Sequence, residues 1–221
     1  MIKLVAFDWN GTIIADLEAV LRANNAVLRH FGKKEISLLE YQTHFRVPIK
    51  DYWASLGYDP NYFDQISAEQ EKVFINNYEP EESKLRTRSG VRDLIKFLTS
   101  ANIESIIFSN HIIPHIELQL RRFKLHHYFN KILGRPLNTR DHQHKRFKDT
   151  YLADYVQSKN YKPNEVVVVG DTDEEIEIGK KFGYVTVALS GGHQTTKRLK
   201  EKNPDYLINN LTELKRIIKK L

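Results

Sequence analysis

Acidic, hydroxyl and amide side chains directly follow three short apolar runs of the sequence. The first run ends in Asp8, the second is followed by Ser109 and Asn110, and the third by Asp171. If these runs are parallel strands, their carboxyl ends meet at one edge of a sheet, where α/β proteins bind ligands. With a lysine from elsewhere in the chain, these groups suit phosphoryl transfer to an aspartate. They include a carboxylate nucleophile, oxygen ligands for a hard cation and donors for phosphoryl oxygens.

Six apolar runs rich in valine and isoleucine predict the sheet that positions these side chains. They cover residues 2–7, 103–108, 129–133, 165–169, 185–188 and 206–208. Continuous apolar strands that alternate with helices are typical of a parallel sheet covered on both faces. We therefore expect an α/β fold with a Rossmann-like, doubly wound parallel sheet.

The interval between the first two runs has no strand pattern and is expected to be an insert. Leu17, Val20, Leu21 and Leu28 recur there at helical spacing, and later segments continue the pattern. We predict an all-helical cap domain at 15–84, inserted into a core domain made of 1–14 and 85–221. Residues 211–221 place apolar and basic side chains on opposite faces, which predicts an amphipathic closing helix.

Composition excludes several classes of protein. The chain has no cysteine, which rules out disulfide scaffolds, zinc–thiolate sites and thiol nucleophiles. No apolar run approaches the roughly 20 residues of a membrane span, and the stretch 1–7 is too short for a signal peptide. We therefore expect a cytoplasmic protein with no membrane partner. The 34 Lys and Arg against 28 Asp and Glu give a net charge of +6, which suits nucleic acid, small phosphorylated anions or ordinary solubility.

Four motifs, in order, resemble those of the haloacid dehalogenase (HAD) superfamily. They are Asp8-Trp9-Asn10-Gly11-Thr12, Ser109-Asn110, Lys145, and Gly170-Asp171 with Glu175. The resemblance covers the whole chain and implies a phosphatase of the phosphoglycolate phosphatase-like branch, whose small helical cap of the C1 type follows the first motif. Residues 145–152 resemble the branch's usual Lys-Pro-x-Pro-Asp-x-Tyr-Leu, so Lys145 rather than Lys148 is taken as the catalytic lysine.

The resemblance implies a covalent route for hydrolysis of a phosphate ester. Asp8 is the nucleophile and carries the phosphoryl group as an aspartyl-phosphate. Ser109, with Asn110 beside it, binds the phosphoryl oxygens. Lys145 neutralises charge between Asp8 and that group.

The resemblance also implies a Mg²⁺ site, and Mg²⁺ is the cofactor we expect, since it prefers oxygen ligands. Asp8 and Asp171 supply carboxylates, and Asn10 supplies its main-chain carbonyl. Glu175 holds a metal-bound water or the catalytic lysine. Its alternative is a solvated acid in the first turn of a helix, favoured by the helix dipole, which is the role expected of residues 173–174.

Asn10 departs from the pattern of the family's phosphatases, which place an Asp at this position as general acid and base. An amide transfers no proton, and losing such assistance costs about 10²- to 10⁴-fold in rate. One interpretation is a phosphatase in which His111 or an ordered water supplies the proton, or whose substrate has a good leaving group. A second is a catalytically weak relative that binds a phosphorylated ligand. A 2-haloacid dehalogenase ranks last, because Asp171 and Glu175 indicate a metal that dehalogenation does not require.

The substrate is expected to be a small phosphorylated metabolite. Arg46 and Lys50, in a loop before a predicted cap helix, are candidates to bind its acidic end, and the alternative is that both are solvated cations. The densest basic segment, 135–148, contains only one aromatic residue, Phe147, so nucleic acid is not the expected partner. The sequence sets no oligomeric state.

Overall fold

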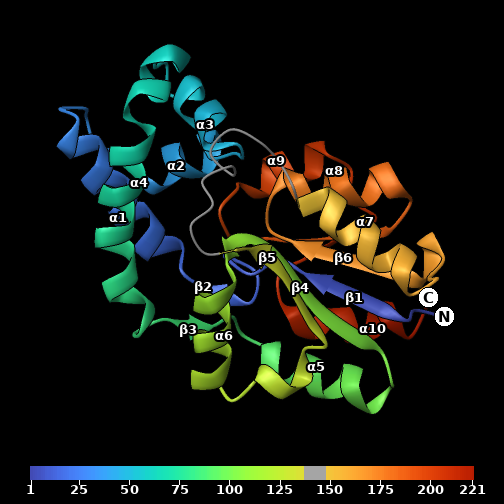
Figure 1. The fold of residues 1–221 in the computed structure, drawn as a ribbon. Coiled ribbons are helices and arrows are strands. Elements are labelled where there is room, and N and C mark those ends of the chain that lie inside the picture. Colours follow the sequence, from blue (N-terminus) through green and yellow to red (C-terminus); the bar gives the residue numbers. More distant parts are fainter. Residues whose placement is uncertain (137–147) are drawn as a thin grey trace.

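A six-stranded, fully parallel sheet forms the centre of the protein in the computed structural model, which describes residues 1–136 and 148–221 (Figure 1). The strand order is β5-β4-β1-β6-β7-β8. The strands are β1 (Leu4–Phe7), β4 (Glu104–Ile112), β5 (Lys131–Arg135), β6 (Val166–Gly170), β7 (Val185–Leu189) and β8 (Tyr206–Ile208). The predicted doubly wound α/β sheet is confirmed.

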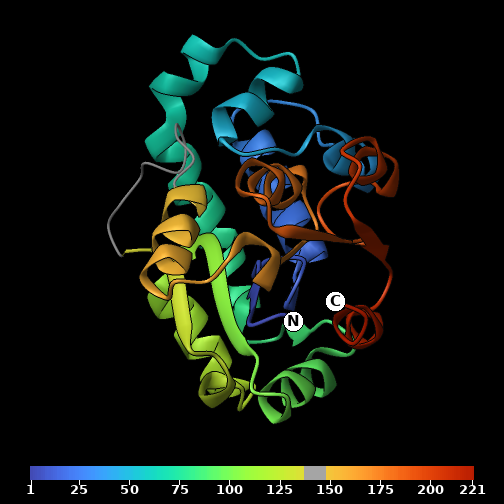
Figure 2. The same cartoon turned by 90° about the vertical axis from the view of Figure 1, so that its right-hand side faces the viewer.

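Alternate residues of the strands face two separate layers of helices. Along β1, Val5 and Phe7 belong to one apolar cluster, and Leu4 and Ala6 belong to another. The helices α5 (Val91–Ser100), α6 (Ile113–Arg122) and α10 (Leu214–Ile218) pack on the first face. The helices α7 (Lys148–Ser158) and α8 (Asp173–Phe182) pack on the second, and the short α9 (Thr196–Glu201) packs beside α8. Figure 2 shows these layers from the side. Both faces are therefore buried, which explains why the strands are apolar throughout.

Four helices between β1 and β4 form a third apolar cluster beyond the end of the sheet (Figure 1). They are α1 (Leu17–His30), α2 (Leu38–His44), α3 (Ile49–Ser55) and α4 (Pro60–Glu82). Buried aromatic side chains dominate their shared core, with Tyr41, Trp53 and Phe63 at its centre. We call residues 15–84 the cap, as proposed from the sequence.

A two-residue antiparallel pair, absent from the sequence prediction, joins the cap to the rest of the chain. Strand β2 (Ile14–Ala15) pairs with β3 (Arg86–Thr87), with Ile14 opposite Thr87 and Ala15 opposite Arg86. Two-residue strands carry too little pattern to be predicted from sequence. No helix in the described part of the chain is long and apolar enough to cross a membrane.

Two leucines of helix α6 test the layer assignment. Leu120 is 1% exposed and packs under the sheet, whereas Leu118 is 64% exposed. We expect Leu120→Ala to lower the free energy of unfolding by about 2–5 kcal/mol, because it leaves a cavity in the core. The matched control Leu118→Ala should change it by no more than about 0.5 kcal/mol. Urea denaturation of both variants measures the difference, and equal losses would contradict this packing.

Candidate active site

A cavity of about 190 Å³ lies between the carboxyl ends of the central strands and the cap. Asp8 lines it directly after β1, and Ser109 lines it from the irregular end of β4, where the pairing with β5 shifts register. Lys148 and Glu175 line it from the first turns of α7 and α8. The structure thus brings three of the predicted motif regions to one site.

Lys148 is the cation that contacts Asp8. Its Nζ lies 2.6 Å from Asp8 Oδ1, forms a closer ion pair with Glu175, and is 4.6 Å from the centre of the Phe108 ring. Burial opposes the charged form of this lysine, but Asp8, Glu175 and Glu174 outweigh burial and raise the pKa of Lys148. Lys148 is therefore a permanent cation between buried carboxylates.

Among the described residues, Lys148 is the lysine in contact with Asp8, which is the place that the motif comparison gave to Lys145. Lys145 falls within 137–147, outside the described residues. The two lysines are three residues apart in one basic segment, and the spacing of the motif favoured the first. Lys148 is the first residue of α7, and from that position the Lys148 side chain reaches Asp8.

Asp8 and Asp171 form a pair of buried carboxylates. Burial raises the pKa of Asp8 well above its usual value; Lys148 opposes this effect, and the charges of Glu175 and Asp171 add to it. Burial likewise raises the pKa of Asp171, with the charge of His193 acting against it. Oxygen donors whose negative charge is incompletely balanced suit a hard divalent cation, so these residues fit the expected Mg²⁺.

Close packing fixes the Asp171 carboxylate in place. Thr12 Oγ1 donates to Oδ1 at 2.7 Å, and the main-chain N–H of His193 donates to Oδ2 at 2.6 Å. Gly11, which has a φ of +71°, and Gly192 approach so closely that a Cβ at either position would collide with this carboxylate. Both positions therefore require glycine.

The acids at the start of α8 are buried, which corrects the expectation for residues 173–174. Glu175 is 2% exposed, accepts hydrogen bonds from the Thr172 main chain and hydroxyl, and pairs with Lys148. The lysine-holding role fits Glu175, and the solvated alternative does not. Asp173 pairs with Arg198, and Glu174 accepts from Asn110 Nδ2 at 2.9 Å. The helix dipole favours these acids, but side chains from distant segments hold them.

Asn10 is anchored by a buried acid that sequence reasoning missed. Its Nδ2 donates to Asp16 Oδ2 at 2.6 Å and lies 3.2 Å from the Tyr78 hydroxyl. Asp16 is fully buried and also accepts from the Gly11 main-chain N–H at 2.8 Å. The Asn10 side chain is thus a donor in a buried network.

His193 completes this network. Its Nε2 lies 3.2 Å from Asp16 Oδ1, and its Nδ1 lies 2.9 Å from the Tyr41 hydroxyl of the cap. Burial disfavours the charged forms of both Asp16 and His193, but the attraction between the two charges outweighs burial. It lowers the pKa of Asp16 and raises the pKa of His193 to about 9. His193 follows the run 185–188, so the rule that polar residues after apolar runs lie at the site could have found it. No comparable signal marks Asp16.

The predicted substrate-binding residues have different surroundings. Ser109 and Asn110 line the cavity, as expected for residues that contact substrate. Arg46 and Lys50 do not line it, because Arg46 Nε donates to the His44 carbonyl and Lys50 Nζ binds Asp64 at 2.6 Å. The structure therefore does not bring these two cations to Asp8.

Phosphatases are among the known proteins that this chain resembles in sequence. A phosphoglycolate phosphatase of Pseudomonas savastanoi pv. phaseolicola is 23% identical over 96% of this chain and 78% of its own length. A phosphoglycolate phosphatase of Synechococcus elongatus is also 23% identical, over 99% of this chain and 98% of its own.

Solved structures share the fold. The crystal structure of a protein described as a predicted phosphatase of Clostridium acetobutylicum superposes with a TM-score of 0.83 at 18% identity, covering all of both chains. CbbY of Rhodobacter sphaeroides, in complex with phosphate, superposes with a TM-score of 0.72 at 17% identity, covering 97% of this chain and 96% of its own. The profile of the family described as haloacid dehalogenase-like hydrolase matches residues 5–189, and the chain belongs to this family.

Proposed function

We propose that this HAD-family phosphatase hydrolyses a small phosphorylated metabolite through an aspartyl-phosphate on Asp8. The observation that carries the proposal is the contact of Lys148 Nζ with Asp8 Oδ1 in the lining of the cavity between the strand ends and the cap. Asp8, Asp171 and the Asn10 main-chain carbonyl would hold Mg²⁺, which would reduce repulsion between the two anions and stabilise charge on the phosphoryl oxygens. A cytoplasmic location without a nucleic-acid partner is part of the same proposal.

Asp8 performs the covalent step in this mechanism. A carboxylate oxygen of Asp8 bonds to phosphorus while the bond from phosphorus to the leaving oxygen breaks, and water then releases inorganic phosphate from Asp8. Lys148 opposes the neutral form of Asp8 that burial favours. Ser109 Oγ accepts a hydrogen bond from the main-chain N–H of His111 at 3.1 Å, so its own proton remains to be donated to a phosphoryl oxygen.

Proton transfer to the leaving group is the weak part of this site. The Asn10 amide donates a hydrogen bond to Asp16, but an amide is too weak an acid to transfer a proton to a leaving group. Substrates with weakly basic leaving groups, such as aryl or acyl phosphates, therefore suit the site better than alkyl esters. A binding protein with little turnover is the second candidate, and the same hydrogen bond to Asn10 supports it.

The lining of the cavity favours a small and largely uncharged leaving group. Its volume is below the ~300–1,000 Å³ typical of sites for drug-sized ligands. Half of the cap side chains that line it are apolar, namely Val20, Phe45, Val47, Ile49, Phe74 and Ile75, and none of the cap's lining residues is a lysine or arginine. The described cationic lining residues come from the core, and Arg135 already pairs with Glu71 of the cap at 3.1 Å.

A panel of phosphate esters tests the function. We expect phosphate release that requires added Mg²⁺, is faster for aryl and acyl phosphates than for phosphoglycolate, and falls to background in Asp8→Asn. Release that persists in Asp8→Asn would refute the nucleophile. Binding without turnover would favour the second candidate, and chloride release from 2-chloro acids without metal would favour a dehalogenase.

Two lysine variants separate the competing assignments. Lys148→Gln removes the buried cation at Asp8, so we expect kcat to fall by about 10²-fold or more, the loss typical for one group that stabilises the transition state. Lys145→Gln, a matched change three residues earlier, should retain most activity. Steady-state kinetics measures both variants, and the opposite order would restore Lys145 as the catalytic lysine.

Exchanging the acid and the amide tests the role of Asn10. The double variant Asn10→Asp/Asp16→Asn keeps one donor and one acceptor in the 2.6 Å contact but places a carboxyl group at position 10. If the missing acid limits the rate, this variant should hydrolyse alkyl esters about 10²- to 10⁴-fold faster than the original protein.

The single change Asn10→Asp is the control for this exchange. It would set two carboxylates against each other, so we expect a less stable protein with a smaller gain in rate. A folded double variant with unchanged kcat would show that proton transfer does not limit turnover.

A further inference from the structure

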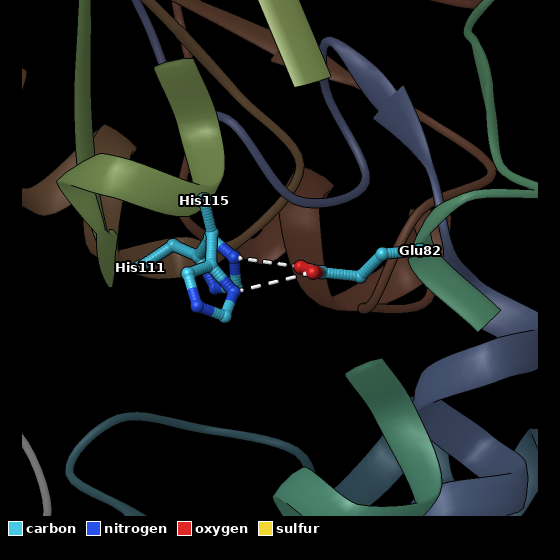
Figure 3. A group of neighbouring side chains, drawn as sticks. All are labelled: Glu82, His111 and His115. Atoms are coloured by element: carbon cyan, nitrogen blue, oxygen red, sulfur yellow. Dashed lines mark hydrogen bonds and ion pairs between the residues drawn. The ribbon is translucent and has the colours of Figure 1, made fainter. Parts of the chain in front are cut away.

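A cluster of one carboxylate and two imidazoles lies at the rim of the cavity, apart from Asp8 and Lys148. Glu82 is the last residue of α4, His111 lies near the end of β4, and His115 is in the first turn of α6. Glu82 Oε1 is 3.1 Å from His111 Nε2, and Glu82 Oε2 is 3.2 Å from His115 Nδ1 (Figure 3). We propose that these three side chains bind a divalent transition-metal ion, with Zn²⁺ as the natural occupant.

The geometry suits such an ion. One ligand atom from each residue lies within 4.8 Å of the other two. In a tetrahedral zinc site with bonds of about 2.0–2.1 Å, ligand atoms are separated by ~3.3 Å. The distances of 3.1 and 3.2 Å between the Glu82 oxygens and the two histidine nitrogens are close to that separation, so both imidazoles already lie where ligands of one ion would be.

The surroundings of the cluster resemble those of bound metals. The side chains of Glu82, His111 and His115 are 9%, 17% and 24% exposed, so water reaches them only in part. His115 Nε2, the nitrogen that faces away from Glu82, lies 3.7 Å from Glu79 Oε1. A second carboxylate on the outer nitrogen of a ligating histidine fixes the ring and makes it a stronger ligand.

The donor set distinguishes this site from the proposed Mg²⁺ site. Imidazole nitrogens favour Zn²⁺ and other transition ions, whereas carboxylate oxygens alone favour Mg²⁺. Three protein ligands leave one position of a tetrahedral ion for water or an anionic ligand oxygen. Because His111 and His115 line the cavity, that position is within reach of a bound ligand.

A bound ion would join the cap to the core. Glu82 ends the longest cap helix, and both histidines belong to core elements. Arg122 already donates to the main-chain carbonyls of Glu82 and Leu85, which holds the end of α4 beside α6. The alternative without metal is a Glu82 carboxylate that is hydrogen-bonded to the two imidazoles, and the two cases differ in measurable ways.

Titration of the metal-depleted, full-length protein with Zn²⁺ in excess Mg²⁺ tests the proposal. We expect calorimetry to show one saturable Zn²⁺ per chain and the melting temperature to rise with free Zn²⁺, because the ion binds the folded state. Co²⁺ in place of Zn²⁺ should give the visible absorption of a tetrahedral site. Absence of saturable binding would overturn the proposal.

Variants locate the ion. Glu82→Gln and His115→Gln should each abolish saturable binding. His127→Gln, which changes an exposed histidine of the 3₁₀ helix His126–Tyr128, should leave binding unchanged. Asp171→Asn should also retain it, because that carboxylate belongs to the other site. Loss in Asp171→Asn with retention in His115→Gln would overturn the proposal.

A measurement on the unmodified protein guards against variants that fail to fold. Zinc X-ray absorption of the loaded protein should show two imidazole ligands in the coordination shell. A shell made only of oxygen would place the ion among carboxylates and refute the site.

Discussion

The ion pair between Lys148 and Asp8 is the constraint on which the rest of the site depends. Asp8, Glu175 and Asp171 bring negative charge into a buried region, and burial pushes the carboxyls of Asp8 and Asp171 toward the neutral form. A neutral Asp8 is a poor nucleophile. The buried ammonium opposes that neutralisation, and Glu175, fixed by Thr172 at the start of α8, holds it in place. The charges at the strand ends and in the first turns of α7 and α8 therefore stabilise one another.

A second pair of charges explains why position 10 carries an amide. Asp16 and His193 form a buried carboxylate–imidazolium pair directly behind Asn10, and Tyr41 of the cap contacts the imidazole. A carboxylate at position 10 would lie against Asp16, and repulsion would force one of the two to take up a proton. The amide avoids this conflict by donating to Asp16. The amide at position 10 is thus one part of a buried network that also includes Asp16, His193 and Tyr41.

The sheet was predictable because its sequence signals are local. The buried network of Asn10, Asp16 and His193 was not, because its members come from distant parts of the chain. Continuous apolar runs mark each main strand, and the polar residues after them place Asp8, Ser109 and Asp171 near one another. The pairing of Asp16 with His193 joins residues 177 positions apart, and neither belongs to a recognisable motif. The choice between Lys145 and Lys148 depended on where α7 begins, which spacing alone does not determine. The burial of Asp173 and Glu174 likewise follows from Arg198 and Asn110, which reach them from other segments.

The short pair of β2 and β3 divides the molecule into two modules, the core and the cap. Ala15 and Arg86 lie opposite each other, so the chain leaves the core and returns to it at neighbouring points. The polypeptide between them can differ in length or sequence without stretching the parallel sheet or moving Asp8. The proposed nucleophile belongs to one module, and much of the surface that would meet the leaving group belongs to the other. Substrate preference can therefore evolve by changes in the second module that keep Asp16, Tyr41 and Tyr78, the cap residues that hold Asn10 and His193.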